Sequence, residues 1–238
     1  MSKRRGSFLK KLKLALVGKG IKHSKSQQMY EELLGTSVDY TLLDYEQESQ
    51  IPNLSDLLLD YQGVSITAPY KHVFIPQCEV DEFFKDLNAI NCTGRFGDTL
   101  RGTNTDFLAL ENLTQNYFQN FEKIILLGDG AMARITVALF EKNNIQFEQF
   151  SRKLNPDFFE KDFVYMGEGK ESFLIINSCG RKYEFNQPLS SNTVFYDYNY
   201  AHEHHTNFFK KSDGKYIDGL ELLKSQARYA LKFWGIIS

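Results

Sequence analysis

The sequence has few cysteines, no long apolar run and almost no net charge, and each shortage argues against a class of protein. Its three cysteines, Cys78, Cys92 and Cys179, form no CxxC pair. This argues against a disulfide framework or a zinc site and favours a reducing compartment. No apolar stretch approaches the ~18 residues of a membrane span. The net charge of −2 gives no indication of binding to nucleic acid or to an acidic membrane surface.

The start of the chain, MSKRRGSFLKKLKLALVG, is basic but lacks the h-region and cleavage site of a signal peptide. We interpret it as a basic tail that leads into a first strand, with a targeting role as the less favoured alternative. We expect a cytoplasmic protein that is a monomer or a homodimer. Aromatic residues are plentiful, with 20 Phe and 13 Tyr, and they support a packed core.

Strand-like and helix-like segments alternate along the whole chain, which indicates a parallel sheet with right-handed crossovers. We expect an α/β protein of two closely coupled domains. The first covers 1–106 and is completed by a C-terminal helix within 219–238, and the second covers 107–218. The expected strands are 13–18, 38–45, 63–67, 147–153, 172–180 and 192–200, and the expected helices are 26–35, 51–61, 107–118 and 219–235. The segment 123–143 is expected to form a strand, a glycine turn and a helix in that order.

The segment LLGDGAMAR contains a GxGxxA pattern formed by Gly128, Gly130 and Ala133, between an apolar strand and a helix. The first glycine allows a tight turn, the second lets a pyrophosphate approach the backbone, and the small third residue lets helix and strand pack closely. The free N–H groups of the helix then face the phosphates. A simple strand-to-helix turn is the alternative, and Asp129 between the glycines counts against a phosphate site.

The end of the next strand indicates which dinucleotide is bound. An acidic residue there suits the ribose 2′-hydroxyl of NAD, whereas an arginine accommodates the 2′-phosphate of NADP. The segment here is Ser151-Arg152-Lys153, and its two cations favour NADP. Glu148 is the competing acid, but we expect it within the strand. The alternative for Arg152 is a solvated strand end.

The motifs along the chain, taken together and in order, resemble those of the shikimate dehydrogenase family. HSKS resembles the family's HSxSP segment, GVSITAPYK its GxNVTxPxK, NAINCT its GAVNT, and GTNTD matches GxNTD. LLGDGAMAR resembles the GAGGAxxA turn, FSRK the NRT segment, YDYNY the YDxxY segment, and DGLELLKSQA resembles DGxxMLxxQA. The resemblance covers nearly the whole chain and implies a substrate domain at 1–106 and a Rossmann-like NADP-binding domain at 107–218.

The resemblance implies reversible, NADPH-dependent reduction of 3-dehydroshikimate to shikimate in the biosynthesis of chorismate and aromatic amino acids, without a metal. It implies Lys71 and Asp106 as catalytic residues. The implied substrate residues are Ser24, Ser26, Thr67, Asn91, Tyr200 and Gln226. The implied cofactor residues are Gly128, Asp129, Gly130, Ala131, Ala133, Ser151, Arg152, Lys153 and Gly219.

The chemistry supports the same two catalytic residues independently. Hydride attack on a ketone builds negative charge on its oxygen, which a positioned acid must stabilise and protonate. An ammonium such as that of Lys71 suits this role, and a carboxylate such as that of Asp106 orients it and binds a substrate hydroxyl. Taken alone, a lysine after a proline is usually solvent-exposed, and Asp106 also fits the cap of a helix that starts at Phe107.

Several positions depart from the family pattern. Ser65 replaces the Asn of GxNVTxP, Gln27 replaces a Pro, and Tyr30-Glu31 replaces a His-Asn pair. The glycine turn is GDGAM, and the family's NATxxGM is reduced to NSCG at 177–180. These departures keep two alternatives open: a dehydrogenase that uses NAD or accepts quinate, and a relative that binds a shikimate-like ligand without turnover. The cluster HEHH at 202–205 has metal-like spacing, but we expect an ordinary polar loop there.

Overall fold

The computed structural model describes residues 11–155 and 171–238, so most of the basic start of the chain, at 1–10, lies outside the described residues. The described chain forms two compact units. One unit takes the chain up to Asn104 and includes Ala230–Ser238 from its far end, and the other comprises Thr105–Tyr229. In the part of the chain that is described, no helix is both long and apolar enough to cross a membrane.

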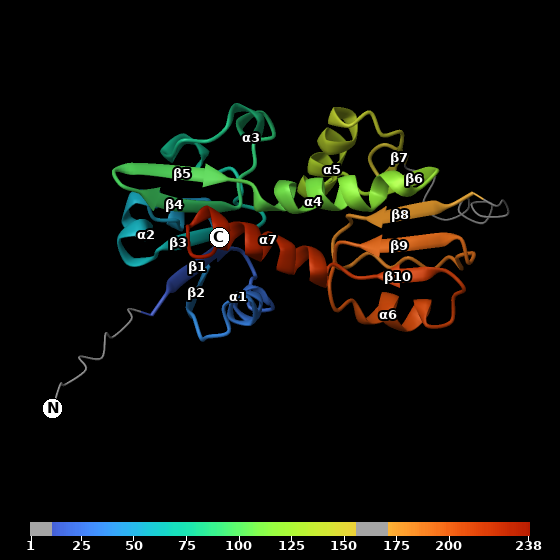
Figure 1. The fold of residues 1–238 in the computed structure, drawn as a ribbon, viewed down its shortest axis with the longest axis horizontal. Coiled ribbons are helices and arrows are strands. Elements are labelled where there is room, and N and C mark those ends of the chain that lie inside the picture. Colours follow the sequence, from blue (N-terminus) through green and yellow to red (C-terminus); the bar gives the residue numbers. More distant parts are fainter. Residues whose placement is uncertain (1–10, 156–170) are drawn as a thin grey trace. The chain divides into compact units, whose positions relative to one another are not determined.

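The first unit contains a five-stranded mixed sheet in the order β2-β1-β3-β4-β5 (Figure 1). β1 is parallel to β2 and β3, whereas β4 is antiparallel to both β3 and β5. The parallel arrangement expected from the sequence therefore applies to three strands, and a hairpin completes the sheet. The elements are β1 (Lys13–Gly18), α1 (Ser26–Leu34), β2 (Asp39–Asp44), α2 (Leu54–Asp60), β3 (Gly63–Ile66), α3 (Glu82–Asp86), β4 (Cys92–Phe96) and β5 (Thr99–Thr103).

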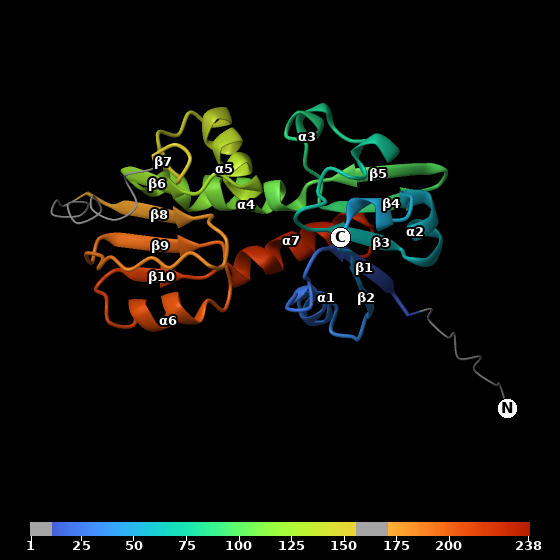
Figure 2. The same ribbon diagram turned by 180° about the vertical axis from the view of Figure 1, so that it is seen from behind.

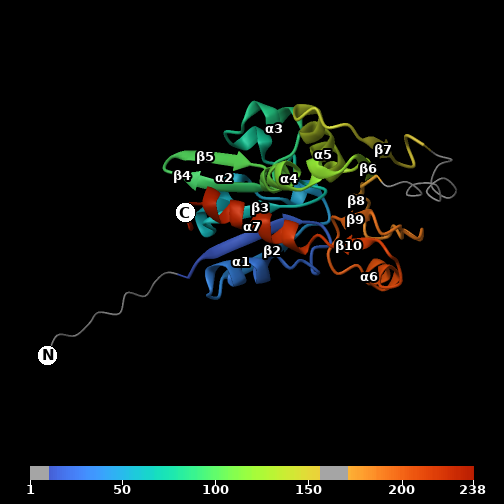
Figure 3. The ribbon, with the colours of Figure 1, turned by 45° about the vertical axis from the view of Figure 1, so that its right-hand side comes forward.

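Local sequence explains why these elements form. The five residues of β1 after Lys13 are all buried, as expected for a parallel strand covered on both faces. Helix α1 ends at Gly35, which adopts a left-handed conformation with φ of 65° and donates its N–H to the Glu31 carbonyl. The helix lies beside β1 and β2 in two views (Figures 1 and 3).

The C-terminal residues complete the core of the first unit through Trp234. Its indole Nε1 donates to the Thr93 carbonyl over 2.9 Å, and its ring lies 5.7 Å from the ring of Tyr30. Gly63 and Gly94 leave room for this indole, because a Cβ on Gly63 would lie 2.2 Å from the ring. The end of the chain is therefore part of the sheet's packing.

The second unit contains a five-stranded parallel sheet in the order β10-β9-β8-β6-β7, seen from two sides in Figures 1 and 2. This is the Rossmann-like sheet that the sequence predicts. A buried aromatic cluster that includes Phe185, Phe195 and Phe209 fills one side of it. The elements are α4 (Thr105–Asn116), β6 (Lys123–Leu127), α5 (Ala131–Lys142), β7 (Glu148–Phe150), β8 (Phe173–Asn177), β9 (Thr193–Asp197), α6 (Glu203–Phe209) and β10 (Lys215–Ile217). Helix α7 (Leu220–Phe233) begins in this unit, and its residues from Ala230 on belong to the first unit.

Candidate active site

Polar residues of the first unit gather where β1 and β3 end. The Thr67 N–H donates to the Val17 carbonyl over 2.9 Å, so the residue after β3 stays attached to β1. Gly18 makes room for it, since a Cβ on Gly18 would lie 2.5 Å from Thr67 Cγ2. Because β1 and β3 are parallel, their carboxyl ends share one edge of the sheet, which is where open α/β sheets bind ligands.

Three further predicted substrate residues lie in the segments next to these strands. The hydroxyls of Ser24 and Ser26 are 3.1 Å apart, and Ser24 Oγ also accepts the Ser26 N–H. Ser26 is the first residue of α1, and the preceding Lys25 is the N-cap of the helix. Asn91 directly precedes the antiparallel β4, and its carbonyl accepts the Ile66 N–H at the end of β3.

Two departures from the family pattern, Tyr30 and Ser65, contact each other. The Tyr30 hydroxyl lies 3.0 Å from Ser65 Oγ, and both side chains are buried. Ser65 lies on β3, two residues before Thr67, which directly follows the strand.

The turn that carries Lys71 is fixed to its surroundings by hydrogen bonds. The peptide bond between Ala68 and Pro69 is cis, and the Tyr70 N–H donates to the Thr67 carbonyl. The Tyr70 hydroxyl donates to the Tyr45 carbonyl over 2.9 Å. The Lys71 carbonyl accepts the Ile90 N–H over 2.8 Å, and the residue is half-buried. Lys71 is therefore not on a loose surface loop.

Asp106 belongs to the second unit and is 6% exposed. Helix α4 begins at Thr105, so Asp106 lies inside its first turn. The alternative in which Asp106 is the N-cap of a helix that starts at Phe107 is therefore wrong. A carboxylate in the first turn of a helix is favoured by the helix dipole, which gives Asp106 a structural role in addition to any catalytic one.

The glycine turn of the second unit uses its two glycines differently. Gly128 has φ of 108°, and a Cβ there would lie 2.7 Å from Ser178 Oγ and 3.2 Å from the Cys179 backbone nitrogen. Gly130 is the N-cap of α5 with φ of −73°, and a Cβ on it would meet nothing within 4 Å. No side chain caps the helix. Gly128 therefore serves the packing of the fold, whereas Gly130 leaves the helix N-terminus open.

A cavity of about 1050 Å³ lies at this turn. Its open helix N-terminus and its cations fit the phosphates of a dinucleotide. Asp129 also lines the cavity, as the one acidic residue of the turn. Ala131 and Ala133 continue along α5, where Ala133 is fully buried against the sheet as the third position of the pattern requires. The lining residues are Gly128, Asp129, Gly130, Ser151, Arg152, Lys153 and 178–187.

The end of β7 contributes the cations Arg152 and Lys153, both exposed and both lining the cavity. They follow Ser151, which is 2% exposed and whose Oγ accepts the Leu154 N–H over 3.1 Å, so the turn that presents them is held in place. Glu148 opens β7 and is absent from the described residues that line the cavity. The two cations rather than this acid therefore line the cavity.

The remaining predicted residues lie in the loop after β9, directly before α7 and on α7. Gly219 approaches the loop after β9 closely, because a Cβ on it would lie 2.3 Å from the Tyr198 carbonyl oxygen. Its N–H donates to the Asn199 carbonyl. Tyr200 follows in the same loop and is half-buried, and its carbonyl accepts from Arg181 over 2.7 Å. Gln226 lies half-buried on α7.

A buried network around Asp197 lies below this loop, and the sequence patterns did not reveal it. The carboxylate of Asp197 accepts hydrogen bonds from Asn177, from Asn199 and from His205 Nδ1, the last over 2.6 Å. His205 Nε2 accepts the Phe185 N–H, so its proton is on Nδ1. The register of the sheet pairs Asn177 with Asp197 directly. The sequence patterns could not reveal this contact, because Asn177 and Asp197 are far apart in sequence and are brought together only by the pairing of β8 with β9.

The HEHH segment is part of a helix rather than a loop. His202 is the N-cap of α6, and its Nδ1 accepts the His205 N–H. Its Nε2 therefore carries the proton and donates to the Arg181 carbonyl over 3.0 Å. Among residues 11–155 and 171–238, no group of three or more His, Cys, Asp or Glu side chains has an arrangement that could hold a metal ion.

Residues 16–93 match the family model of the shikimate dehydrogenase substrate binding domain. A curated relative, the shikimate dehydrogenase (NADP(+)) of Prochlorococcus marinus (strain MIT 9215), is 28% identical over 260 residues, which cover 93% of this chain and 91% of the relative. The chain belongs to the shikimate dehydrogenase family. The family members that the chain matches are oxidoreductases.

Solved structures of the family share the fold. The shikimate dehydrogenase of Aquifex aeolicus has a TM-score of 0.73 and 21% identity, with 95% of this chain and 93% of that chain covered. The quinate dehydrogenase of Corynebacterium glutamicum, solved in complex with NAD, has a TM-score of 0.66 and 17% identity, with 95% and 94% covered. Identities this low support a common fold for the shikimate dehydrogenase family and do not distinguish between its activities.

Proposed function

We propose that this protein is an NADP-dependent shikimate dehydrogenase, which reversibly reduces 3-dehydroshikimate to shikimate in the biosynthesis of chorismate. The observation that carries the proposal is the cavity at the glycine turn. A relative that binds ligand without turnover has no need of a dinucleotide cavity, whereas this chain keeps an uncapped helix N-terminus, an unobstructed Gly130 and two cations at one site.

In this proposal NADP, when bound, supplies the hydride chemistry of the reaction. The chain's own contribution is binding, charge and proton transfer. Negative charge that develops on the ketone oxygen is stabilised by the Lys71 ammonium, which also donates the proton; in the reverse direction Lys71 accepts it. The fixed backbone of Lys71 suits this role, because a general acid is effective only when its position is held.

Asp106 is proposed to orient Lys71 and to accept a hydrogen bond from a substrate hydroxyl. The remaining hydroxyls and the carboxylate of the substrate are proposed to bind to hydrogen-bonding groups rather than to an arginine. A site of this kind rejects analogues that lack a hydroxyl, because its buried polar groups are then left unpaired. The proposed substrate residues are Ser24, Ser26, Thr67, Asn91, Tyr200 and Gln226.

Arg152 and Lys153 are proposed to bind the 2′-phosphate, which selects NADP over NAD. The proposed backbone and turn contacts for the rest of the dinucleotide come from Gly128, Asp129, Gly130, Ala131, Ala133, Ser151 and Gly219.

Oxidation of quinate is a second candidate, favoured by the Tyr30–Ser65 contact. This pair differs from the residues of the family pattern and lies close in sequence to Thr67, a proposed substrate residue. We therefore expect any change in substrate preference to concern the hydroxyl groups on the ring of the substrate. A quinate dehydrogenase with NAD is also among the solved proteins of this fold.

Initial rates with shikimate and quinate, each with NADP and NAD, test the proposal. We expect the highest kcat/KM for shikimate with NADP, and a fall in kcat of about 10²-fold or more in Lys71→Ala, the scale for loss of a positioned acid–base group. Lys85→Ala is the matched control, since Lys85 is exposed and ion-paired with Glu82. If no pair turns over while shikimate raises the Tm, the protein is a binding relative and the proposal is wrong.

A further inference from the structure

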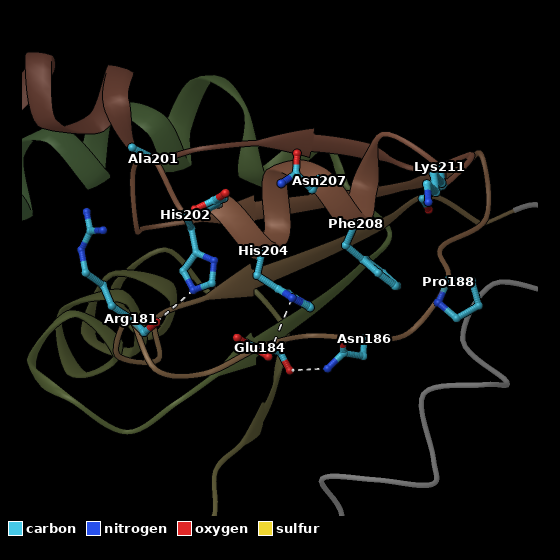
Figure 4. Close-up of a pocket in the computed structure, with 12 residues that line it drawn as sticks. Arg181, Glu184, Asn186, Pro188, Ala201, His202, His204, Asn207, Phe208 and Lys211 are labelled. Carbon is cyan, nitrogen blue, oxygen red and sulfur yellow. Dashed lines mark hydrogen bonds and ion pairs between the residues drawn. The ribbon is translucent and has the colours of Figure 1, made fainter.

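The loop after β8 (178–183) and the loop after β9 (198–202) are joined by three hydrogen bonds. Asn199 Nδ2 donates to the Cys179 carbonyl over 3.0 Å, and the Arg181 guanidinium donates to the Tyr200 carbonyl over 2.7 Å. In return His202 Nε2 donates to the Arg181 carbonyl, as the dashed line between them in Figure 4 shows. Each loop therefore donates to the other.

Arg181 holds Tyr200 in two ways. Besides the bond to the Tyr200 carbonyl, its guanidinium carbon lies 4.9 Å from the centre of the Tyr200 ring, a cation–π contact. The backbone turns sharply at the next residue, because Ala201 has φ of 50°. A single cation thus fixes both the backbone and the ring of Tyr200 where the chain changes direction.

The two loops are joined at their bases by the buried network, whereas at their tips the Arg181 side chain contacts Tyr200. At the bases, the buried Asp197 binds Asn177 below the first loop and Asn199 below the second. At the tips, Arg181 and Ala201 are exposed. Removal of the Arg181 side chain therefore removes its hydrogen bond and its ring contact to Tyr200 and leaves the buried network in place.

All residues of the first loop line the cavity of the glycine turn. A ligand in that cavity touches the loop that holds Tyr200. We propose that Arg181 is a positioning residue that orients Tyr200 toward the substrate and makes its orientation respond to occupancy of the cavity. The inference rests on the proposed function, because Tyr200 is a substrate residue only within that proposal.

A double-mutant cycle between Arg181 and Tyr200 tests this inference. We expect Arg181→Met to raise the KM for shikimate about tenfold, the factor for loss of one charge-assisted hydrogen bond, with kcat and the KM for NADP changed less than threefold. Arg181→Lys, which keeps the cation, is expected to recover part of the loss. In a Tyr200→Ala background, Arg181→Met should have no further effect, since a residue that acts through another has non-additive effects.

Arg95→Met is the matched control, because Arg95 is an exposed arginine of the first unit that also donates to a carbonyl, that of Ser55. It should leave all constants unchanged. Additive effects of Arg181→Met and Tyr200→Ala, or a rise in the KM for NADP alone, would overturn the inference and make Arg181 a direct contact of the cofactor.

Hydrogen–deuterium exchange over 198–202 separates this inference from the proposed function. Faster exchange in Arg181→Met than in wild type, by about tenfold, supports the positioning role even if no substrate pair turns over. Unchanged exchange refutes it even if wild type is an active shikimate dehydrogenase. In wild type, NADP should slow exchange in the same segment, and Arg181→Met should abolish that effect.

Discussion

Substitution of the two turn glycines by alanine should have opposite consequences, because only one of the positions lacks room for a side chain. Gly128→Ala places a Cβ 2.7 Å from Ser178 Oγ at a φ of 108°. Forcing an L-residue toward the left-handed region costs about 1–2 kcal/mol, and overpacking adds about 1–3 kcal/mol. We therefore expect the free energy of unfolding to fall by roughly 2–5 kcal/mol.

Gly130→Ala should leave stability nearly unchanged, because its φ of −73° suits alanine and its Cβ meets nothing within 4 Å. Reduced chain entropy in the unfolded state stabilises by about 0.4–1 kcal/mol, and the loss of glycine at the N-cap offsets a few tenths of that. The added methyl group instead fills the space through which a pyrophosphate approaches the backbone. We expect the affinity for NADP to fall about tenfold or more, on the scale of one displaced phosphate hydrogen bond.

Urea denaturation without cofactor and calorimetric titration with NADP measure the two effects separately. Each variant is the control of the other, since both add one methyl group to the same turn. The reasoning is refuted if Gly130→Ala binds NADP as tightly as wild type, because the open helix N-terminus is then not the phosphate site. Equal loss of stability in both variants would also contradict it.

Three other predictions concern single positions. Arg152→Gln should lower kcat/KM with NADP about tenfold or more while sparing NAD, measured against Arg134→Gln on the exposed face of α5 as control. Burial raises the pKa of the Cys179 thiol to about 11, opposed in part by the charge of Arg152. Since only the thiolate reacts, its alkylation should still accelerate above pH 9, with no plateau near the ordinary pKa, as site-resolved mass spectrometry can test. Gly63→Ala should cost about 1–3 kcal/mol in urea denaturation because its Cβ meets the Trp234 ring, and Trp234→Leu should relieve part of that cost.

The fold was largely predictable where the pattern of a single segment is enough to indicate a strand or a helix. The apolar run of β1, the strand–turn–helix of β6 and α5, and the long helix α7 all follow the expected pattern. The β4–β5 hairpin was not predicted, because Gly94 and Gly102 interrupt its strands. Those glycines are explained only by contacts from elsewhere: Trp234 lies against Gly94, and Ile90 and Cys78 lie against Gly102.

The candidate site was predictable to a similar degree. The cavity of the glycine turn brings together Gly128, Gly130, Arg152 and Lys153, as the pattern indicates. Arg181 was not singled out, although it lies beside the same cavity, because its partner Tyr200 is remote in sequence and is brought near by the pairing of β8 with β9. Helix α6 was missed because histidine is an unusual N-cap residue.

The placement of Trp234 affects the order in which the two units can complete their packing during synthesis. Ala230–Ser238 belong to the same unit as the residues up to Asn104, so that unit lacks its indole until the segment after Tyr229 has left the ribosome. The unit formed by Thr105–Tyr229 is continuous in sequence and is fully synthesised first. Until Trp234 arrives, the groove over Gly63 and Gly94 is an exposed apolar surface, the kind of surface that chaperones recognise in a chain still being synthesised.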